Sequence, residues 1–286
     1  MDSVAVVTDS ACCIPPELVT QHHIRVIPLL IIHEGISYRD GIDMSPTEVY
    51  RIMRKKNTVP TTSIPSPGDI LETYRRLSEQ AESILCITVT GLQSQMFDTA
   101  LLAKEMAKQE LPGVSIEVMD SRAVAGALGF IVLAAAKAAQ AGASLAETIE
   151  AAQTMKPRVN SIFMLDTLYY LAKTGRIGRA SAWAGGLLDM KPIVEHSTAI
   201  GETTPVARPR TRSKALGRML EIMAERVGDS PAHVMVHHGD ELEEAERLRA
   251  EIAARFNCVE LHITDFTPAM GVHAGPGLLA VSFYSC

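Results

Sequence analysis

Aromatic residues are scarce in this sequence of 286 residues, which has one Trp and six Phe although 47% of its residues are hydrophobic. We therefore expect a core built mainly from aliphatic side chains and methionine. Cysteine is also scarce, and the odd number of five does not match a disulfide framework. The adjacent pair Cys12-Cys13 could be redox-active, although neighbouring cysteines are more often plain small residues.

Runs of positive charge are absent as well. The net charge is −6 at pH 7 and no block of Lys and Arg occurs, which argues against nucleic acid as the main partner. The longest uncharged run, between Arg122 and Lys137, is too short to span a bilayer and is typical of a buried helix. The opening residues MDSVAVVTDS lack the pattern of a secretory signal. We expect a soluble, cytoplasmic protein with no stable membrane insertion.

Two enzyme signatures are missing, a G-x-S-x-G nucleophile elbow and a G-x-x-x-x-G-K-[ST] phosphate loop. An acyl hydrolase that uses Ser94 and His273 with an aspartate therefore remains an alternative without motif support. The HHGD stretch at 237–240 contains two adjacent histidines, which could suggest a metal site. Neighbouring side chains of a strand point to opposite faces, so an ordinary strand end is the favoured interpretation. We expect neither a metal ion nor a cofactor.

Strands and helices alternate in the first half of the chain. Apolar runs such as VAVVTDS and SILCITVT are typical of parallel strands that are covered on both faces. Three of these runs end in small polar residues, at 8–10, 88–91 and 119–121. We predict an N-terminal parallel α/β domain, Rossmann-like and flanked by helices, over residues 1–157, with a ligand edge at the carboxyl ends of its strands.

Hairpins and helices are mixed in residues 158–286. MKPIVEH and GETTPVARP lie on either side of a turn near Gly201, and GLLAVSFY reads as the last strand. This pattern predicts a C-terminal α+β domain with a largely antiparallel sheet. We place the domain boundary near Lys156-Pro157.

The stretch PTTSIPSPGDI at 60–70 sets three hydroxyls before two prolines. Ser66, Pro67 and Asp69 predict a helix that begins at Pro67, because they supply a cap, a first helical residue and a first-turn carboxylate. The hydroxyls of Thr61–Ser63 are then expected on a loop before the helix. The free N–H groups of a helix start suit an anion, although ordinary turn residues are the commoner explanation.

Two other glycine-rich stretches carry candidate residues. GVHAGPG at 271–277 surrounds His273, which could donate to an anion or act as a base, or could simply be the tip of a tight turn. KTGRIGRA at 173–180 contains Arg176 and Arg179, which suit a carboxylate or a phosphate, or could be solvated residues at a helix end. A binder of a small phosphorylated metabolite is therefore a further alternative.

Seven segments together resemble one known family. The segments TDSACCIPPEL, TSIPSPGD, TGLQSQMFDTA, VMDSRAVAGALGF, FMLDTLYYLAKTGRIGRA, KPIVE and GVHAGPGLLAVSFY occur in this order over nearly the whole chain. In this the sequence resembles the DegV family, bacterial fatty-acid-binding proteins that are the carrier subunits of fatty acid kinase in phospholipid metabolism. The resemblance implies one long-chain fatty acid in an apolar tunnel between two domains. It also implies an ATP-dependent kinase as partner, which converts the carboxylate to an acyl phosphate, and an acyltransferase as a further candidate partner. The chain itself would have no turnover.

The same resemblance implies roles for individual residues. Thr62, Ser94 and His273 would hold the fatty-acid carboxylate. Arg176 would lie beside this site, near the head group or at the kinase contact, and Ser63 near the head group.

The sequence departs from the family pattern at several positions. Ile64 replaces the usual Gln, and the QSQMF stretch places Gln95 and Met96 where the family has Gly and Thr. These changes keep the candidate hydroxyls and affect the shape of the loop and the preference for acyl chains.

Overall fold

The computed structural model describes residues 3–55, 58–183 and 190–286. Its first sheet is parallel throughout, with the strand order β2-β1-β6-β7. β6, which begins the SILCITVT segment, is buried at every position, and this confirms a strand covered on both faces. The strands are β2 (Arg25–Ile27), β1 (Val4–Asp9), β6 (Ser83–Thr88) and β7 (Ser115–Asp120).

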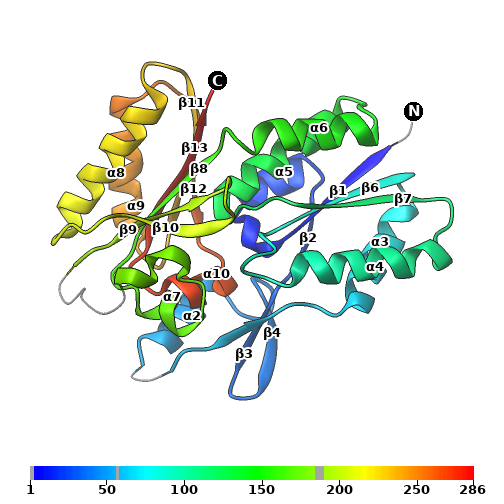
Figure 1. The fold of residues 1–286 in the computed structure, drawn as a ribbon, viewed down its shortest axis with the longest axis horizontal. Coiled ribbons are helices and arrows are strands. Elements are labelled where there is room, and N and C mark those ends of the chain that lie inside the picture. Colours follow the sequence, from blue (N-terminus) through cyan, green and yellow to red (C-terminus); the bar gives the residue numbers. More distant parts are fainter. Residues whose placement is uncertain (1–2, 56–57, 184–189) are drawn as a thin grey trace.

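Helices cover both faces of this sheet, with α3 and α4 on one side and α5 and α6 on the other (Figure 1). α3 begins at Pro67 with Ser66 as its cap, as predicted, and Asp69 completes a capping box with that serine. The sequence analysis did not predict α6, whose start has a capping box of its own between Ser144 and Glu147. The helices are α3 (Pro67–Ser78), α4 (Met96–Glu110), α5 (Ala125–Gln140) and α6 (Leu145–Met155).

The second sheet has the strand order β10-β9-β8-β13-β11-β12. All its neighbours are antiparallel except β11 and β12, which confirms the largely antiparallel sheet. α8 (Arg212–Val227) and α9 (Leu242–Arg255) pack against it (Figure 1). The strands are β8 (Asn160–Met164), β9 (Ile193–Ser197), β10 (Glu202–Ala207), β11 (Ala232–His238), β12 (Cys258–Asp265) and β13 (Leu279–Ser285).

α5 contacts both sheets, since it packs on β1 of the first sheet and on β8 and β13 of the second. Two of its glycines make this close approach feasible. A Cβ atom at Gly129 would lie 2.8 Å from the carbonyl oxygen of Cys12, and one at Gly126 would lie 2.5 Å from Nε2 of His237. The uncharged run is therefore a buried helix, as predicted, and it is apolar all round because protein surrounds it.

A third, antiparallel sheet has the order β4-β3-β5. It corrects one prediction, because Thr61–Ser63 form the edge strand β5 rather than a loop, and Thr62 pairs with Ile31. An edge position is compatible with the prolines that flank this stretch. The strands are β3 (Leu30–His33), β4 (Ile36–Arg39) and β5 (Thr61–Ser63).

A short helix, α10, corrects a second prediction. His273 lies in its last turn rather than on a glycine loop. The helix begins with Pro268, and Gly275 ends it with a φ of 84°. The remaining short elements are η1 (Ser10–Cys12), α1 (Pro16–Gln21), α2 (Pro46–Met53), α7 (Tyr169–Lys173), η2 (Gly178–Trp183) and α10 (Pro268–Ala274).

The division into two domains near Lys156-Pro157 stays a prediction. The larger apolar core takes residues from both sides of that point, such as Val7 and Phe266. A second core, which includes Met219 and Phe283, lies wholly within 158–286. Over the described ranges, every helix is too short or too polar to cross a membrane.

Candidate functional site

A cavity of about 240 Å³ lies between the carboxyl ends of the first sheet's strands, strands of the other two sheets, and α10. Residues just after β1 and β6 contribute to its wall, at the strand ends that the sequence analysis expected to form a ligand edge. Most of the wall is apolar, formed by Ala11, Leu29, Ile64, Val89, Val124, Phe163, Leu165, Leu171, Val194, Phe266, Ala269, Met270 and Ala274.

The polar part of the wall brings together the five residues that the family resemblance implicates, which are Thr62, Ser63, Ser94, Arg176 and His273. The remaining polar lining residues are glutamines and a threonine, and none of the described lining residues carries a carboxylate. Because Arg176 adds a permanent positive charge, the electrostatics of the cavity favour an anion.

Thr62 and His273 meet across a sequence separation of 211 residues, with Thr62 Oγ1 at 2.9 Å from His273 Nε2. β5 therefore places the threonine and α10 the histidine. Burial, together with the charge of Arg176, lowers the pKa of His273 to about 3, so the imidazole is neutral at pH 7. Its other nitrogen, Nδ1, is buried and has no hydrogen-bond partner among the described residues.

Ser94 lies two residues before α4, in the turn that follows β6. Its Oγ accepts a hydrogen bond of 3.2 Å from the backbone N–H of Met96. This bond orients the hydroxyl and uses only its acceptor side, so the hydroxyl hydrogen remains for a ligand. Within the described ranges, no hydrogen bond joins Ser94 to His273.

Arg176 follows α7, where Gly175 turns the chain with a φ of 76°. Its Nε donates to the carbonyl oxygen of Gln93 at 3.2 Å and its Nη1 donates to that of Thr174 at 2.5 Å. Partial burial lowers its pKa, but an arginine remains charged. The side chain is therefore fixed at the cavity wall, and Nη2 has no partner among the described residues.

Gln93 and Thr203 are site residues that the sequence analysis missed. Gln93 Nε2 donates to Thr203 Oγ1 at 3.2 Å and lies 3.5 Å from the carbonyl oxygen of Arg176. Gln93 thus links the turn after β6 to β10 and to the Arg176 segment. The sequence offers one indication of this role, since Gln93 directly precedes Ser94 in the TGLQSQMFDTA segment.

The other candidates of the sequence analysis lie in different surroundings. Arg179 is exposed and pairs with Glu202 at 3.1 Å. His237 is buried, with Nε2 at 3.2 Å from Ser282 Oγ, and no group of metal-ligating side chains occurs in the described part of the chain. Cys12 and Cys13 are buried free thiols, and burial raises the pKa of Cys13 to about 12, which disfavours thiolate chemistry.

The residues that depart from the family pattern lie at the same site. Ile64 and Gln95 line the cavity, and Met96 is fully buried beside it at the start of α4. These departures therefore change the cavity wall itself rather than a distant surface.

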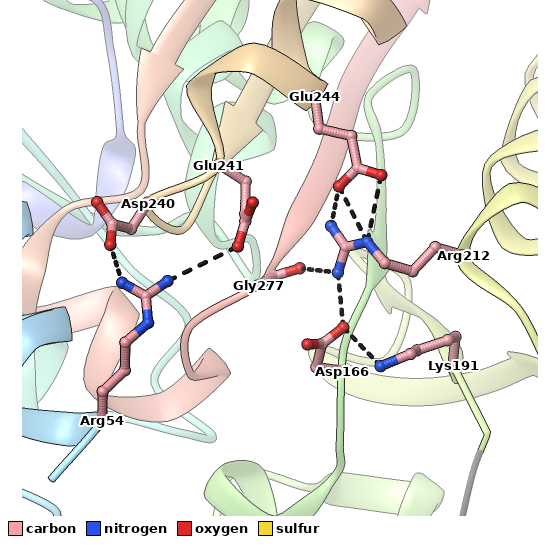
Figure 2. A network of polar contacts seen from close by, with 8 residues as sticks. All are labelled: Arg54, Asp166, Lys191, Arg212, Asp240, Glu241, Glu244 and Gly277. Carbon is pink, nitrogen blue, oxygen red and sulfur yellow. Dashed lines mark hydrogen bonds and ion pairs between the residues drawn. The ribbon is translucent and has the colours of Figure 1, made fainter.

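A second polar cluster lies near the turn that follows α10 (Figure 2). We call it the Arg212 network, and it consists of Arg212, Asp166, Glu244, Lys191 and the carbonyl oxygen of Gly277. Arg212 Nη1 donates to Asp166 at 2.6 Å and to Gly277 at 2.9 Å, and its Nε donates to Glu244 at 2.9 Å. Lys191 also contacts Asp166, at 2.9 Å.

The chain matches one protein family over nearly its whole length. Residues 3–285 match the family model described as "Uncharacterised protein, DegV family". A DegV domain-containing protein of Streptomyces coelicolor is 35% identical over 97% of both chains. Protein DegV of Bacillus subtilis is 32% identical over 98% of both chains.

Solved structures show the same fold. A DegV family protein of Thermus thermophilus, whose structure is described as one of fatty acid binding, gives a TM-score of 0.91 at 29% identity, over 99% of this chain and 100% of that one. DegV of Bacillus subtilis, described as a fatty acid binding protein, gives 0.90 at 30% identity over 100% of both chains. The likeness confirms the α/β fold class and the family inferred from the ordered segments. This chain belongs to the DegV family.

Proposed function

We propose that this protein binds one long-chain fatty acid, with the carboxylate at Thr62, Ser94 and His273. The observation that carries the proposal is the division of the cavity wall into a mostly apolar lining and a polar part that contains hydroxyls, a neutral imidazole and an arginine. Such a wall suits a ligand with a long apolar tail and an anionic head. The two DegV structures described as binding fatty acid support it.

The hydroxyl hydrogens of Thr62 and Ser94 can be donated to the carboxylate, because within the protein both hydroxyl oxygens act as acceptors. The imidazole tautomer protonated at Nε2 donates to Thr62 Oγ1, which frees the threonine hydrogen for a carboxylate oxygen. The Ser94 hydroxyl supplies a second donor, and Ser63 lies beside them in the lining. Hydrogen bonds to a charged group contribute about 1.5–3 kcal/mol each.

The acyl tail supplies most of the affinity. Burial of about fifteen methylenes at ~0.8 kcal/mol each stabilises the complex by on the order of 10 kcal/mol before ordering costs. The polar head then sets the orientation, with the carboxylate at the hydroxyls and the tail along the apolar wall.

The protein acts as a carrier that presents the carboxylate to a separate ATP-dependent kinase, which forms the acyl phosphate. Arg176 supports this role because its guanidinium is fixed beside the head-group residues and keeps Nη2 for phosphoryl oxygens. An acyl hydrolase would need a base within reach of Ser94, whereas His273 is engaged by Thr62. A small phosphorylated metabolite would need a mainly polar pocket, whereas most of this wall is apolar.

Native mass spectrometry of the purified protein tests the binding proposal. We expect one fatty acid for each chain, either co-purified or after addition of hexadecanoic acid, with hexadecan-1-ol, which has the same chain length, as a control for binding without a carboxylate. No acyl species after addition of the acid would refute the proposal.

A reconstituted assay tests the carrier role. With ATP, a bacterial fatty acid kinase and the loaded protein, we expect acyl phosphate; with the loaded protein and ATP alone we expect none. Hydrolysis of an acyl ester by the chain alone, if it disappears in Ser94→Ala, would favour the hydrolase instead.

A further inference from the structure

Asp40 is a buried carboxylate, only 4% exposed, that lies just behind the cavity wall at the end of β4. Its Oδ2 accepts a hydrogen bond of 2.5 Å from Ser10 Oγ, at the end of β1. Its Oδ1 accepts one of 2.9 Å from the backbone N–H of Ala269, in the first turn of α10. The carboxylate thus joins two segments that are far apart in the chain.

α10 depends on this contact because it has no cap of its own. The residue before the helix, Thr267, makes no side-chain capping hydrogen bond to the first turn. The first N–H groups of a helix need an acceptor from elsewhere, and Asp40 supplies one through Ala269. A negative charge also suits the positive end of the helix.

The position of α10 in turn sets the position of His273. Ala269 and His273 are four residues apart, so they share one face of the helix, and both line the cavity. His273 is also the residue that meets Thr62 Oγ1 at 2.9 Å. A shift of the first turn would therefore move the imidazole relative to Thr62.

Asp40 is itself held from the other side. Its backbone N–H donates to the carbonyl oxygen of Leu29 at 2.8 Å, and Ser10 Oγ accepts from the backbone N–H of Leu29 at 3.0 Å. Leu29 also lines the cavity, and Tyr50 packs against Gly271 in the middle of α10. The carboxylate is therefore part of a fixed support and not a mobile side chain.

We propose that Asp40 is a positioning residue that holds α10 so that His273 meets Thr62 at the polar part of the cavity. The link to ligand affinity rests on the proposed function, but the position of His273 does not, because it can be measured without a ligand. Burial raises the pKa of Asp40 to about 6, so the ionised carboxylate is costly at this place. An apolar side chain could fill the core at this place without that cost, whereas only an acceptor can hold the N–H of Ala269.

The test compares Asp40→Ala and Asp40→Asn in the ligand-free protein by ¹⁵N NMR of the histidine rings. The His273 signals are assigned by their loss in His273→Gln. We expect Asp40→Ala to move them toward values for an imidazole that has lost its bond to Thr62. Asp40→Asn should keep them near their original positions, because the amide oxygen still accepts from Ala269.

Affinity for a fluorescent fatty acid gives the second readout. We expect Asp40→Ala to lose about tenfold and Asp40→Asn to stay within about threefold of the unchanged protein. Two controls separate positioning from general effects. Asp43→Asn removes an exposed carboxylate of the same turn, which pairs with Arg39, and Leu248→Ala weakens the second core, which contains no residue of α10.

Unchanged His273 signals in folded Asp40→Ala would overturn the proposal, as would equal shifts in Leu248→Ala. If Asp40→Ala does not fold, Ser10→Ala takes its place, since it removes the hydrogen bond that anchors Oδ2, and unchanged signals there would count equally against the proposal. Absence of fatty acid binding in the unchanged protein would refute the proposed function alone and leave the NMR comparison valid.

Discussion

The Arg212 network and the polar part of the cavity lie on either side of the turn after α10, and they differ in how completely their polar groups are paired. In the network, Arg212 donates hydrogen bonds to two carboxylates and a carbonyl oxygen, and Lys191 forms an ion pair with Asp166 (Figure 2). At the cavity, Nδ1 of His273 and Nη2 of Arg176 have no partner among the described residues.

We interpret this difference as one between a structural cluster and a candidate binding site. In the tautomer that donates from Nε2, Nδ1 of the neutral His273 is an acceptor, so the donor left free beside the apolar cavity is Nη2 of Arg176, which suits an anionic ligand. A saturated network instead ties the chain together. Changes in the Arg212 network should therefore affect stability, and changes at the cavity should affect binding.

The largest effect is expected from Arg212→Met. It leaves Glu244 and Asp166 without their main partner, so we expect the free energy of unfolding to fall by roughly 2–4 kcal/mol, less than for a fully buried pair because the side chains are partly exposed. Urea denaturation measures this, and fatty acid displacement should show affinity within about threefold. A large loss of affinity with unchanged stability would reverse the roles assigned to the two clusters.

Thr62→Val removes one donor and keeps the shape of the side chain. We expect fatty acid affinity to fall by about 1–3 kcal/mol, and the same range for Ser94→Ala. Thr62→Val also removes the acceptor of the buried His273 Nε2, so its free energy of unfolding should fall as well, by about 1–3 kcal/mol. Thr61→Val is the matched control, because its side chain points to the other face of β5 and does not line the cavity. Equal losses for Thr61→Val and Thr62→Val would show that the strand matters and not the hydroxyl at the cavity.

The pH dependence of stability reports the neutral state of the cavity histidine. Burial lowers the pKa of His196 to about 4, and of His237 and His273 to about 3. Below pH 6.5 the unfolded chain therefore binds more protons than the folded chain at these histidines, and the free energy of unfolding decreases as the pH decreases. Burial raises the pKa of Asp9 to about 7 and of Asp40 to about 6, so these two carboxyl groups keep protons in the folded state and oppose this trend.

The histidines outweigh the two carboxyl groups, so between pH 5 and 6 we expect a net loss on the order of 1 kcal/mol for each unit of decrease in pH. Denaturation curves of His273→Gln should show a smaller slope. The same slope as in the unchanged protein would mean that His273 is not held neutral by the fold.

Arg176→Ala should have the smallest effect on affinity, at most about 1 kcal/mol, because in the proposed complex the tail supplies most of the binding. Formation of acyl phosphate with the kinase should fall by more than affinity does. The paired measurement uses Arg179→Ala as control, an exposed arginine that pairs with Glu202. Equal losses of affinity and phosphorylation in Arg176→Ala would place the arginine on the carboxylate itself.

Local signals predicted much of the fold. The cap of α3, the apolar strands and the buried helix α5 follow from short-range patterns. α10 escaped prediction because the glycines around His273 resemble a turn, and the acceptor for its first turn comes from Asp40, 229 residues earlier. The contact between Thr62 and His273 has the same origin, since no local pattern specifies a pairing across the chain.

A crystal structure of the protein with hexadecanoic acid tests the central claim most directly. The account predicts carboxylate oxygens within about 3.2 Å of the Thr62 and Ser94 hydroxyls and beside His273, with the tail along the apolar wall formed by residues such as Phe163 and Met270. A fatty acid bound in the opposite direction, or outside this cavity, would contradict it.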